Sequence, residues 1–193
     1  MIAAQAPSQT LADRFWTRTA TNTHLRFLTM VVLGTALLAL SAHVQVPFWP
    51  VKMSMQSFMV LILAATYGSR LGTVTVVAYL LQGAVGLPMF QNGGGAALFG
   101  GPTTGYLAGF FLATWVVGSL SERGAMRSAL AATGVFLLGD AIIMVLGTAW
   151  LSTLIGFEKA LSAGFLVFLP AEALKISLAV ALTRATDRTL KAR

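Results

Sequence analysis

Residues 168–183 read FLPAEALKISLAVALT, an apolar stretch that contains one acid and one base. Pro170 suits the first position of a helix, and the turns that follow carry no charge beyond Glu172 and Lys175. These two side chains stand three residues apart, so they share one helix face. A charge in the hydrocarbon of a bilayer costs at least about 2.5 to 3.5 kcal/mol, and it persists where it has a partner or a task. The stretch therefore predicts a membrane-spanning helix that carries a binding site.

The composition of the whole chain agrees with a membrane protein. Of 193 residues, 56% are apolar and only 10% are charged, whereas about 25% are charged in an average soluble domain. There is no cysteine, which excludes disulfides and thiolate metal sites. We expect an integral membrane protein of the all-α class, with one domain and a third ionisable residue, Asp140, inside another apolar segment.

Six apolar segments are long enough to be read as membrane spans. The second and third spans are joined by only a few residues, which predicts an antiparallel hairpin around residues 68–72 with Arg70 at the inner surface. The six predicted spans are residues 25–44, 54–67, 71–87, 103–120, 128–150 and 161–183.

The basic residues are distributed as a topology signal. With a cytoplasmic N-terminus, ten of the thirteen Lys and Arg residues fall on the inner side, and only Lys52 and Lys159 fall on the outer side. This bias predicts a multi-pass protein of the bacterial cytoplasmic (inner) membrane with both termini in the cytoplasm, and it accounts for the basic charge without nucleic acid. We expect a cytoplasmic tail at 1–24, a transmembrane substrate-binding domain at 25–184 and a basic cytoplasmic tail at 185–193.

Two outer loops interrupt the apolar pattern. The first, VPFWPVKMSMQ at 46–56, contains two prolines that favour extended backbone. The second, at 86–106, contains Gly93, Gly94 and Gly95, which allow the main chain to approach a ligand closely. Such a loop can serve as a lid over a pocket, and a flexible hairpin is the alternative.

Five motifs in one order resemble the BioY family, the biotin-specific substrate-binding (S) components of energy-coupling factor (ECF) transporters. They are VPxxPVxxxxQ at 46–56, YGSRLG at 67–72, GAVGLPMF at 83–90, GPTTGYLAGF at 101–110 and LPAEALK at 169–175. The resemblance implies a six-helix bundle that captures biotin near the outer face and associates with a transmembrane coupling protein and two ATPases.

The resemblance also implies roles for individual residues. Glu172 and Lys175 match the acid and the lysine of the last motif, and both would face the ureido end of biotin. Asn92 lies near the polar residue of the glycine-rich loop, Gln56 matches the closing glutamine of the first motif, and Tyr106 matches the tyrosine of GPTxGY. The chain departs from the family pattern where Lys52, Met53 and Ser54 replace Pro-hydrophobic-Thr, where Ala171 replaces a glycine and where Asp140 replaces a neutral amide. The small-residue contact for the coupling protein corresponds to Thr35 and Ala39.

The chemistry of biotin can be matched to these residues. Its ureido ring has two N–H donors and a carbonyl, its thiophane ring and chain are apolar, and its tail is a carboxylate. Glu172 can accept from the ureido group, and Lys175 or Asn92 can donate to it. Lys52 is the candidate for the tail carboxylate, and the candidate apolar walls are Phe90, Phe99, Trp150 and Phe168.

A structural role is open for each polar candidate. Glu172 and Lys175 can neutralise one another as an ion pair, and Asp140 can bond a neighbouring helix as a protonated acid. Asn92 can be a turn residue, Gln56 a bridge between helices, and Tyr106 an aromatic at the membrane interface.

Other functional classes lack the residues that they need. An intramembrane protease requires a Ser with a His, an Asp pair or a zinc-binding HExxH, and the sequence contains no such motif. It also lacks GxxxxGK[ST], so ATP hydrolysis would belong to partners. We expect no enzymatic activity, no metal and no cofactor, with biotin as the transported ligand. The alternatives are an S component for riboflavin or thiamine and a membrane scaffold without a ligand.

Overall fold

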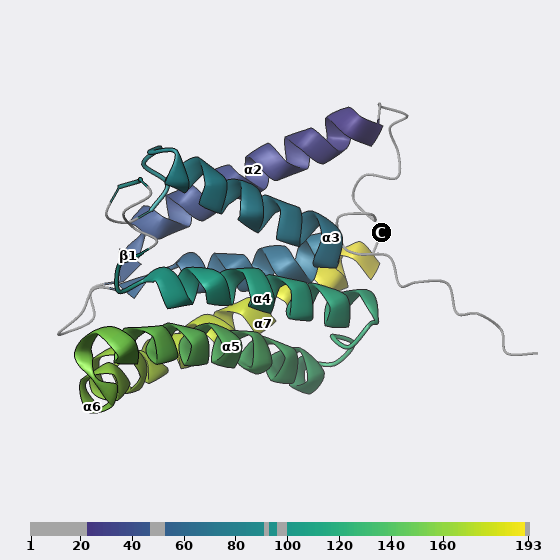
Figure 1. Ribbon diagram of the computed structural model, residues 1–193. Coiled ribbons are helices and arrows are strands. Elements are labelled where there is room, and N and C mark those ends of the chain that lie inside the picture. Colours follow the sequence, from purple (N-terminus) through teal and green to yellow (C-terminus); the bar gives the residue numbers. More distant parts are fainter. Residues whose placement is uncertain (1–22, 47–52, 91–92, 96–99, 192–193) are drawn as a thin grey trace, which may run out of the picture.

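The computed structural model describes residues 23–46, 53–90, 93–95 and 100–191, and it is a bundle of long helices (Figure 1). The prediction of an all-α membrane protein is confirmed. Among the described residues, one pair of two-residue strands, β1 (Gln45–Val46) and β2 (Met53–Ser54), is antiparallel and brackets the loop that the sequence predicts to be the first outer loop. The helices are α2 (Thr23–His43), α3 (Gln56–Ala84), α4 (Thr104–Glu122), α5 (Ala129–Ile155), the short α6 (Phe157–Leu161), a π-helix η2 (Ser162–Leu166) and α7 (Leu169–Lys191).

The element α3 is a helical hairpin. Its 29 residues are continuous except at Gly68, where φ is 80° and ψ is −177°. Gln56 at its start donates a hydrogen bond to Tyr79 near its end, although 23 residues of straight helix would separate them by about 34 Å. The chain must therefore reverse at Gly68, as Figure 1 shows. Only glycine adopts such a positive φ readily, which explains why the predicted hairpin turns at this residue.

The reversal changes the helix count that we predicted. Among the described residues, five helical stretches are long and apolar enough to cross a membrane, and α3 counts as one of them. Two of the six predicted spans are the two limbs of α3, so five stretches stand where six spans were predicted. The last stretch also begins earlier than expected, because α6 and η2 extend it back to Phe157. Helix α7 continues to Lys191, through most of the residues predicted as a tail.

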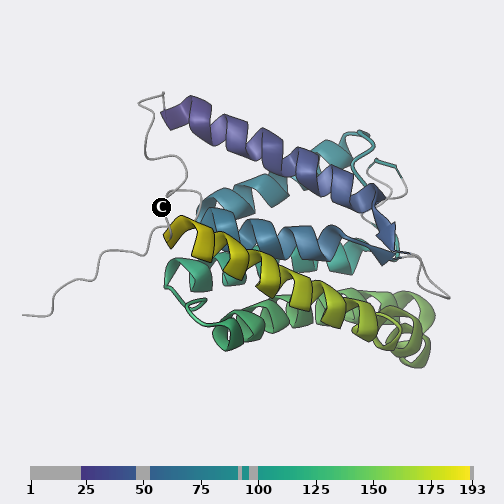
Figure 2. The same cartoon turned by 180° about the vertical axis from the view of Figure 1, so that it is seen from behind.

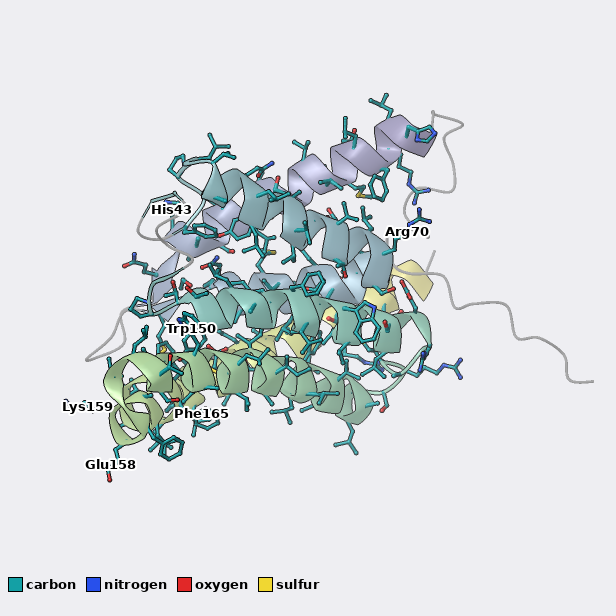
Figure 3. All side chains as sticks on the ribbon, in the orientation of Figure 1. His43, Arg70, Trp150, Glu158, Lys159 and Phe165 are labelled. Carbon is teal, nitrogen blue, oxygen red and sulfur yellow. The ribbon has the colours of Figure 1, made fainter. Side chains whose placement is uncertain are left out.

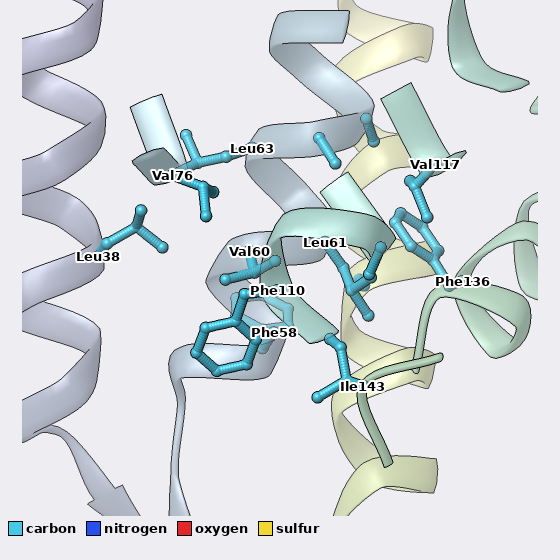
Figure 4. Packing of buried hydrophobic residues seen from close by; sticks show 14 of the residues in the cluster. Leu38, Phe58, Val60, Leu61, Leu63, Val76, Phe110, Val117, Phe136 and Ile143 are labelled. Atoms are coloured by element: carbon cyan, nitrogen blue, oxygen red, sulfur yellow. The ribbon is translucent and has the colours of Figure 1, made fainter. Parts of the chain in front are cut away.

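The core of the bundle lies between the limbs of α3 and the neighbouring helices. α3 packs against α2 and α4, and α4 packs against α5 (Figure 4). α7 lies across the opposite face from α4 and contacts α3 and α5 (Figure 2). The outward faces carry large apolar side chains, such as Leu28 and Leu40 on α2 and Leu130 on α5, which are 62%, 64% and 84% exposed. An apolar outer surface of this extent fits a hydrocarbon environment.

The two ends of the bundle differ in charge. Figure 3 places Arg70 at one end and His43, Trp150, Glu158 and Lys159 at the other. The described chain begins and ends at the Arg70 end (Figures 1 and 2).

At the end of the bundle that the sequence predicts to be the inner one, the Glu122 carboxylate accepts from the Ser69 N–H at 2.7 Å and from the Ser69 hydroxyl at 2.9 Å. This carboxylate caps the second limb of α3 directly after its turn.

We predict that Glu122→Ala lowers the free energy of unfolding by about 0.5 to 2 kcal/mol, because the N–H of Ser69 loses its cap. The measurement is thermal unfolding of the purified protein in detergent. Glu158→Ala is the matched control, since Glu158 is exposed on α6 at the other end. Equal melting temperatures for the Glu122 variant and the unmodified protein would contradict the capping role.

Candidate ligand-binding site

A polar cluster lies inside the bundle where α3, α5 and α7 meet. The Lys175 ammonium on α7 donates to Glu172 Oε1 at 2.8 Å and to the Ser57 hydroxyl on α3 at 3.1 Å. Ser57 donates in turn to Glu172 Oε2 at 3.0 Å. Glu172 and Lys175 are each only 5% exposed. The first two turns of α7 therefore present their acid and base inward, as the spacing of three predicted, and Ser57 connects both to the neighbouring helix.

Asp140 joins this cluster from the middle of α5. Its carboxyl lies within hydrogen-bonding reach of the Glu172 carboxyl, and it also interacts with the charge of Lys175. The residue is 7% exposed, and its Oδ1 has no hydrogen-bond partner among the described residues. The three ionisable residues that the sequence places inside apolar segments thus come together. Whether they bind a ligand remains a prediction.

The ion pair that the sequence left open as a structural role is present. It does not use all the hydrogen-bonding capacity of the cluster. A carboxylate offers about four lone-pair sites, and within the described part of the chain Glu172 receives donors from Ser57 and Lys175. The remaining acceptor sites on Glu172, and the unpartnered oxygen of Asp140, leave the cluster able to receive donors from a polar ligand.

A second network lies next to the cluster, around Tyr79. Gln56, which precedes Ser57, donates to the Tyr79 hydroxyl at 2.5 Å. That hydroxyl donates to the Met89 carbonyl at 2.8 Å, and the Phe90 ring packs edge-on against Tyr79 with centroids 5.2 Å apart. Gln56 thus bridges the two limbs of α3, as its structural alternative predicted. Phe90 is buried, so the start of the glycine-rich loop is anchored to the helix that carries Ser57.

Tyr106 on α4 supports the segment that precedes α7. Its hydroxyl donates to the Gly164 carbonyl in η2 at 2.6 Å, and its ring lies 6.5 Å from that of Phe168. Gly147 on α5 has no side chain, and a Cβ there would overlap the Tyr106 ring. This close packing sets the position of the π-helix that leads into α7. Tyr106 therefore braces the segment before Glu172.

The remaining predicted site residues fall in two groups. Trp150 donates from its indole N–H to the Gly101 carbonyl at 2.9 Å, which ties α5 to the end of the second outer loop. Lys52, Asn92 and Phe99 lie outside the residues that the structure describes. Their predicted roles toward the tail carboxylate, the ureido group and the apolar wall stay predictions.

Comparison with known proteins identifies the family. The BioY family profile matches residues 14–192. The chain belongs to the BioY family. The resemblance predicted from the five motifs is thereby confirmed.

Individual BioY relatives resemble the chain over most of its length. "Biotin transporter BioY" of Thermotoga maritima is 38% identical over 157 residues, which cover 80% of this chain and 92% of the relative. "Probable biotin transporter BioY" of Rickettsia prowazekii is 32% identical over 165 residues, which cover 85% of this chain and 84% of the relative. A crystal structure of the S-component for biotin from an ECF-type ABC transporter matches with a TM-score of 0.75 and 26% identity, covering 88% of this chain and 95% of that one.

Two residues of the site in this BioY-family chain were missed by the sequence reasoning. Ser57 has an ordinary small polar side chain, and only its place directly after Gln56 could have drawn attention to it. Tyr79 lies within VVAYLLQ, where a phenol hydroxyl surrounded by apolar residues needs a hydrogen-bond partner. That requirement was a signal for an interhelical contact, although it did not name the partner.

We predict that Tyr106→Phe loosens the segment 162–168, because the Gly164 carbonyl loses its shorter side-chain hydrogen bond and keeps the longer one from Thr148 at 3.3 Å. The expected loss in unfolding free energy is about 0.5 to 1.5 kcal/mol. Hydrogen–deuterium exchange should become faster in this segment. Tyr67→Phe is the matched control, since it removes a phenol hydroxyl that bonds the Met30 carbonyl on α2. Unchanged exchange in the Tyr106 variant would refute the bracing role.

Proposed function

We propose that this protein captures biotin with high affinity and takes it across the cytoplasmic membrane as the S component of an ECF transporter. The observation that carries the proposal is the buried cluster of Ser57, Glu172 and Lys175 in a BioY-family bundle. The family match, the two transporter relatives and the S-component structure support biotin as the ligand.

The cluster offers groups that complement the ureido ring. Glu172 is the proposed acceptor for a ureido N–H, and Lys175 is the proposed donor to the ureido carbonyl. Because both groups already bond each other and Ser57, biotin would insert into an existing polar network. A ligand that displaces these bonds without supplying matching groups would leave buried charges unpaired, at a cost of about 1 to 3 kcal/mol for each group. This penalty is the proposed source of specificity.

Other residues complete the proposed site. Gln56 and Phe90 belong to the network around Tyr79, next to Ser57, and Tyr106 braces the segment before α7. Asp140 adds a further carboxyl beside Glu172. Asn92 is proposed as a second ureido donor and Lys52 as the cation for the tail carboxylate. Both follow from the motif resemblance and from the chemistry of biotin.

The proposed energy source is a partner complex. The chain has no phosphate-binding motif of its own, so ATP hydrolysis is assigned to ATPase subunits that act through a transmembrane coupling protein. The protein itself would carry out no bond chemistry. The description of the solved relative as part of an ECF-type ABC transporter supports this assignment.

The orientation in the membrane is also proposed. Arg184 donates to the Arg127 carbonyl at 2.8 Å, so α7 and the loop between α4 and α5 present arginines together. Arg70 lies at the end of the bundle where the described chain begins and ends (Figure 3). Basic residues collect on the cytoplasmic side, which supports cytoplasmic termini in a bacterial inner membrane. The proposed regions are a cytoplasmic tail at 1–24, a transmembrane substrate-binding domain at 25–184 and a basic cytoplasmic tail at 185–193.

Titration calorimetry of the purified protein with biotin tests the function. Glu172→Gln and Lys175→Ala should each weaken biotin binding by about 5- to 150-fold, because one partner of the ureido group is lost. Lys159→Ala removes an exposed lysine on α6 and should leave the affinity unchanged.

Titrations with other vitamins separate the alternative functions, and a double variant controls for folding. Riboflavin or thiamine binding in place of biotin would identify another S component, and the absence of saturable binding to any of these vitamins would favour a scaffold. The pair Glu172→Gln with Lys175→Met removes both charges together, so a folded protein is expected even if a single variant unfolds. Full biotin affinity in that pair would remove these residues from the site.

A further inference from the structure

The cluster at the centre of the bundle contains more acid than base. Asp140 and Glu172 are both buried, and Lys175 is the buried base that faces them. If all three groups were ionised, one negative charge would be left in excess inside a membrane-spanning bundle. An uncompensated buried charge is strongly unfavourable, so the cluster must acquire a compensating positive charge.

Among the described residues, the other charged groups on the helices that pack against α5 lie toward the ends of the bundle. From α4, Glu122 is bonded to Ser69 at the turn of α3, where Arg70 is exposed. On α6, Glu158 and Lys159 are exposed at the opposite end. On α7, Arg184 bonds the Arg127 carbonyl at the end that carries Arg70. Ser57 from α3 contributes a neutral hydroxyl, which is occupied by Lys175 and Glu172.

The hydrogen bonds indicate which acid is ionised. Glu172 receives donors from both Lys175 and Ser57, which stabilise its charged form. Asp140 receives no donor at Oδ1 among the described residues, although this atom is buried. Two ionised carboxylates within hydrogen-bonding reach cannot bond each other, because both only accept. A proton on Asp140 makes it a donor, and the Glu172 carboxylate is the acceptor within its reach.

We propose that Asp140 and Glu172 form a proton-binding site, in which one proton taken from water resides on Asp140 and makes the buried cluster neutral. The proton is shared by hydrogen bonding with Glu172, so Asp140 acts on a ligand through Glu172 as a positioning residue. This inference stands on the cluster alone and does not depend on which ligand the protein carries.

A link between this proton and biotin rests on the proposed function. The ureido group is neutral and brings no compensating charge, so the neutral cluster is the form that receives it. Ionised Asp140 would place a second negative charge beside Glu172 and compete for Lys175. Protonation therefore favours binding, and by linkage binding favours protonation. Biotin affinity should fall as pH rises and Asp140 loses its proton, and binding at the higher pH should take up a proton.

Infrared spectroscopy of the ligand-free protein in lipid vesicles tests the proton site directly. A protonated carboxylic acid gives a carbonyl stretching band that an ionised carboxylate lacks, and this band shifts in D2O. We expect the band at neutral pH, its displacement when aspartate is labelled with carbon-13 at the side-chain carboxyl, and its loss in Asp140→Asn. The isotope label needs no substitution, so it remains informative if the variant misfolds. Asp187→Asn, outside the cluster, should retain the band.

The infrared outcome and biotin binding can fail separately. If the labelled-aspartate band is absent, or if it persists unchanged in folded Asp140→Asn, the proton site is refuted, whatever the protein binds. If the band is present but biotin does not bind, the proton site stands and the proposed function fails. With both intact, calorimetry in buffers of different ionisation enthalpy, at a pH where the infrared band of the free protein is largely lost, should show proton uptake on biotin binding that is absent in Asp140→Asn. Equal proton uptake in that variant would overturn the link.

Discussion

The structure depends on one constraint, that polar groups inside a bilayer must find partners within the protein. Most buried hydroxyl groups meet it locally, as Thr75 and Thr114 do by donating to backbone carbonyls four residues earlier in their own helices. The cluster of Ser57, Asp140, Glu172 and Lys175 meets it between helices. This cluster joins α3, α5 and α7. The ionisable side chains that are costly to bury in a bilayer are therefore also the ones that hold these three helices together.

The same constraint explains how much could be predicted from the sequence. Hydrophobic length and the basic residues predicted a multi-pass helical protein, and the inward placement of Glu172 and Lys175 followed from their spacing. A connection around Gly68 was predicted, but not that a single residue makes the whole turn. In α3 the positive φ of Gly68 reverses the chain, and the residues on both sides of it stay helical. Ser57, Tyr79 and the π-helix at Ser162–Leu166 depend on tertiary contacts that periodicity does not report.

Asp140 connects the sequence with the proposed chemistry. The motif resemblance implies a neutral amide at this position, and the chain has an acid beside Glu172. A protonated acid is also neutral and can also donate a hydrogen bond, so a shared proton reconciles the departure with a site built for a neutral ureido group. Gln56 and Tyr106 support the site indirectly, because their hydrogen bonds hold the segments that present Ser57 and Glu172.

The central claim is that this buried polarity exists to be shared with a ligand. The most direct measurement is an experimental structure of the full chain in complex with biotin. We expect the ureido ring within hydrogen-bonding distance of Glu172 and Lys175, with Ser57 still bonded to Glu172. Biotin bound elsewhere, with Glu172 and Lys175 bonded to each other at 2.8 Å as they are here, would contradict a ligand role for the cluster.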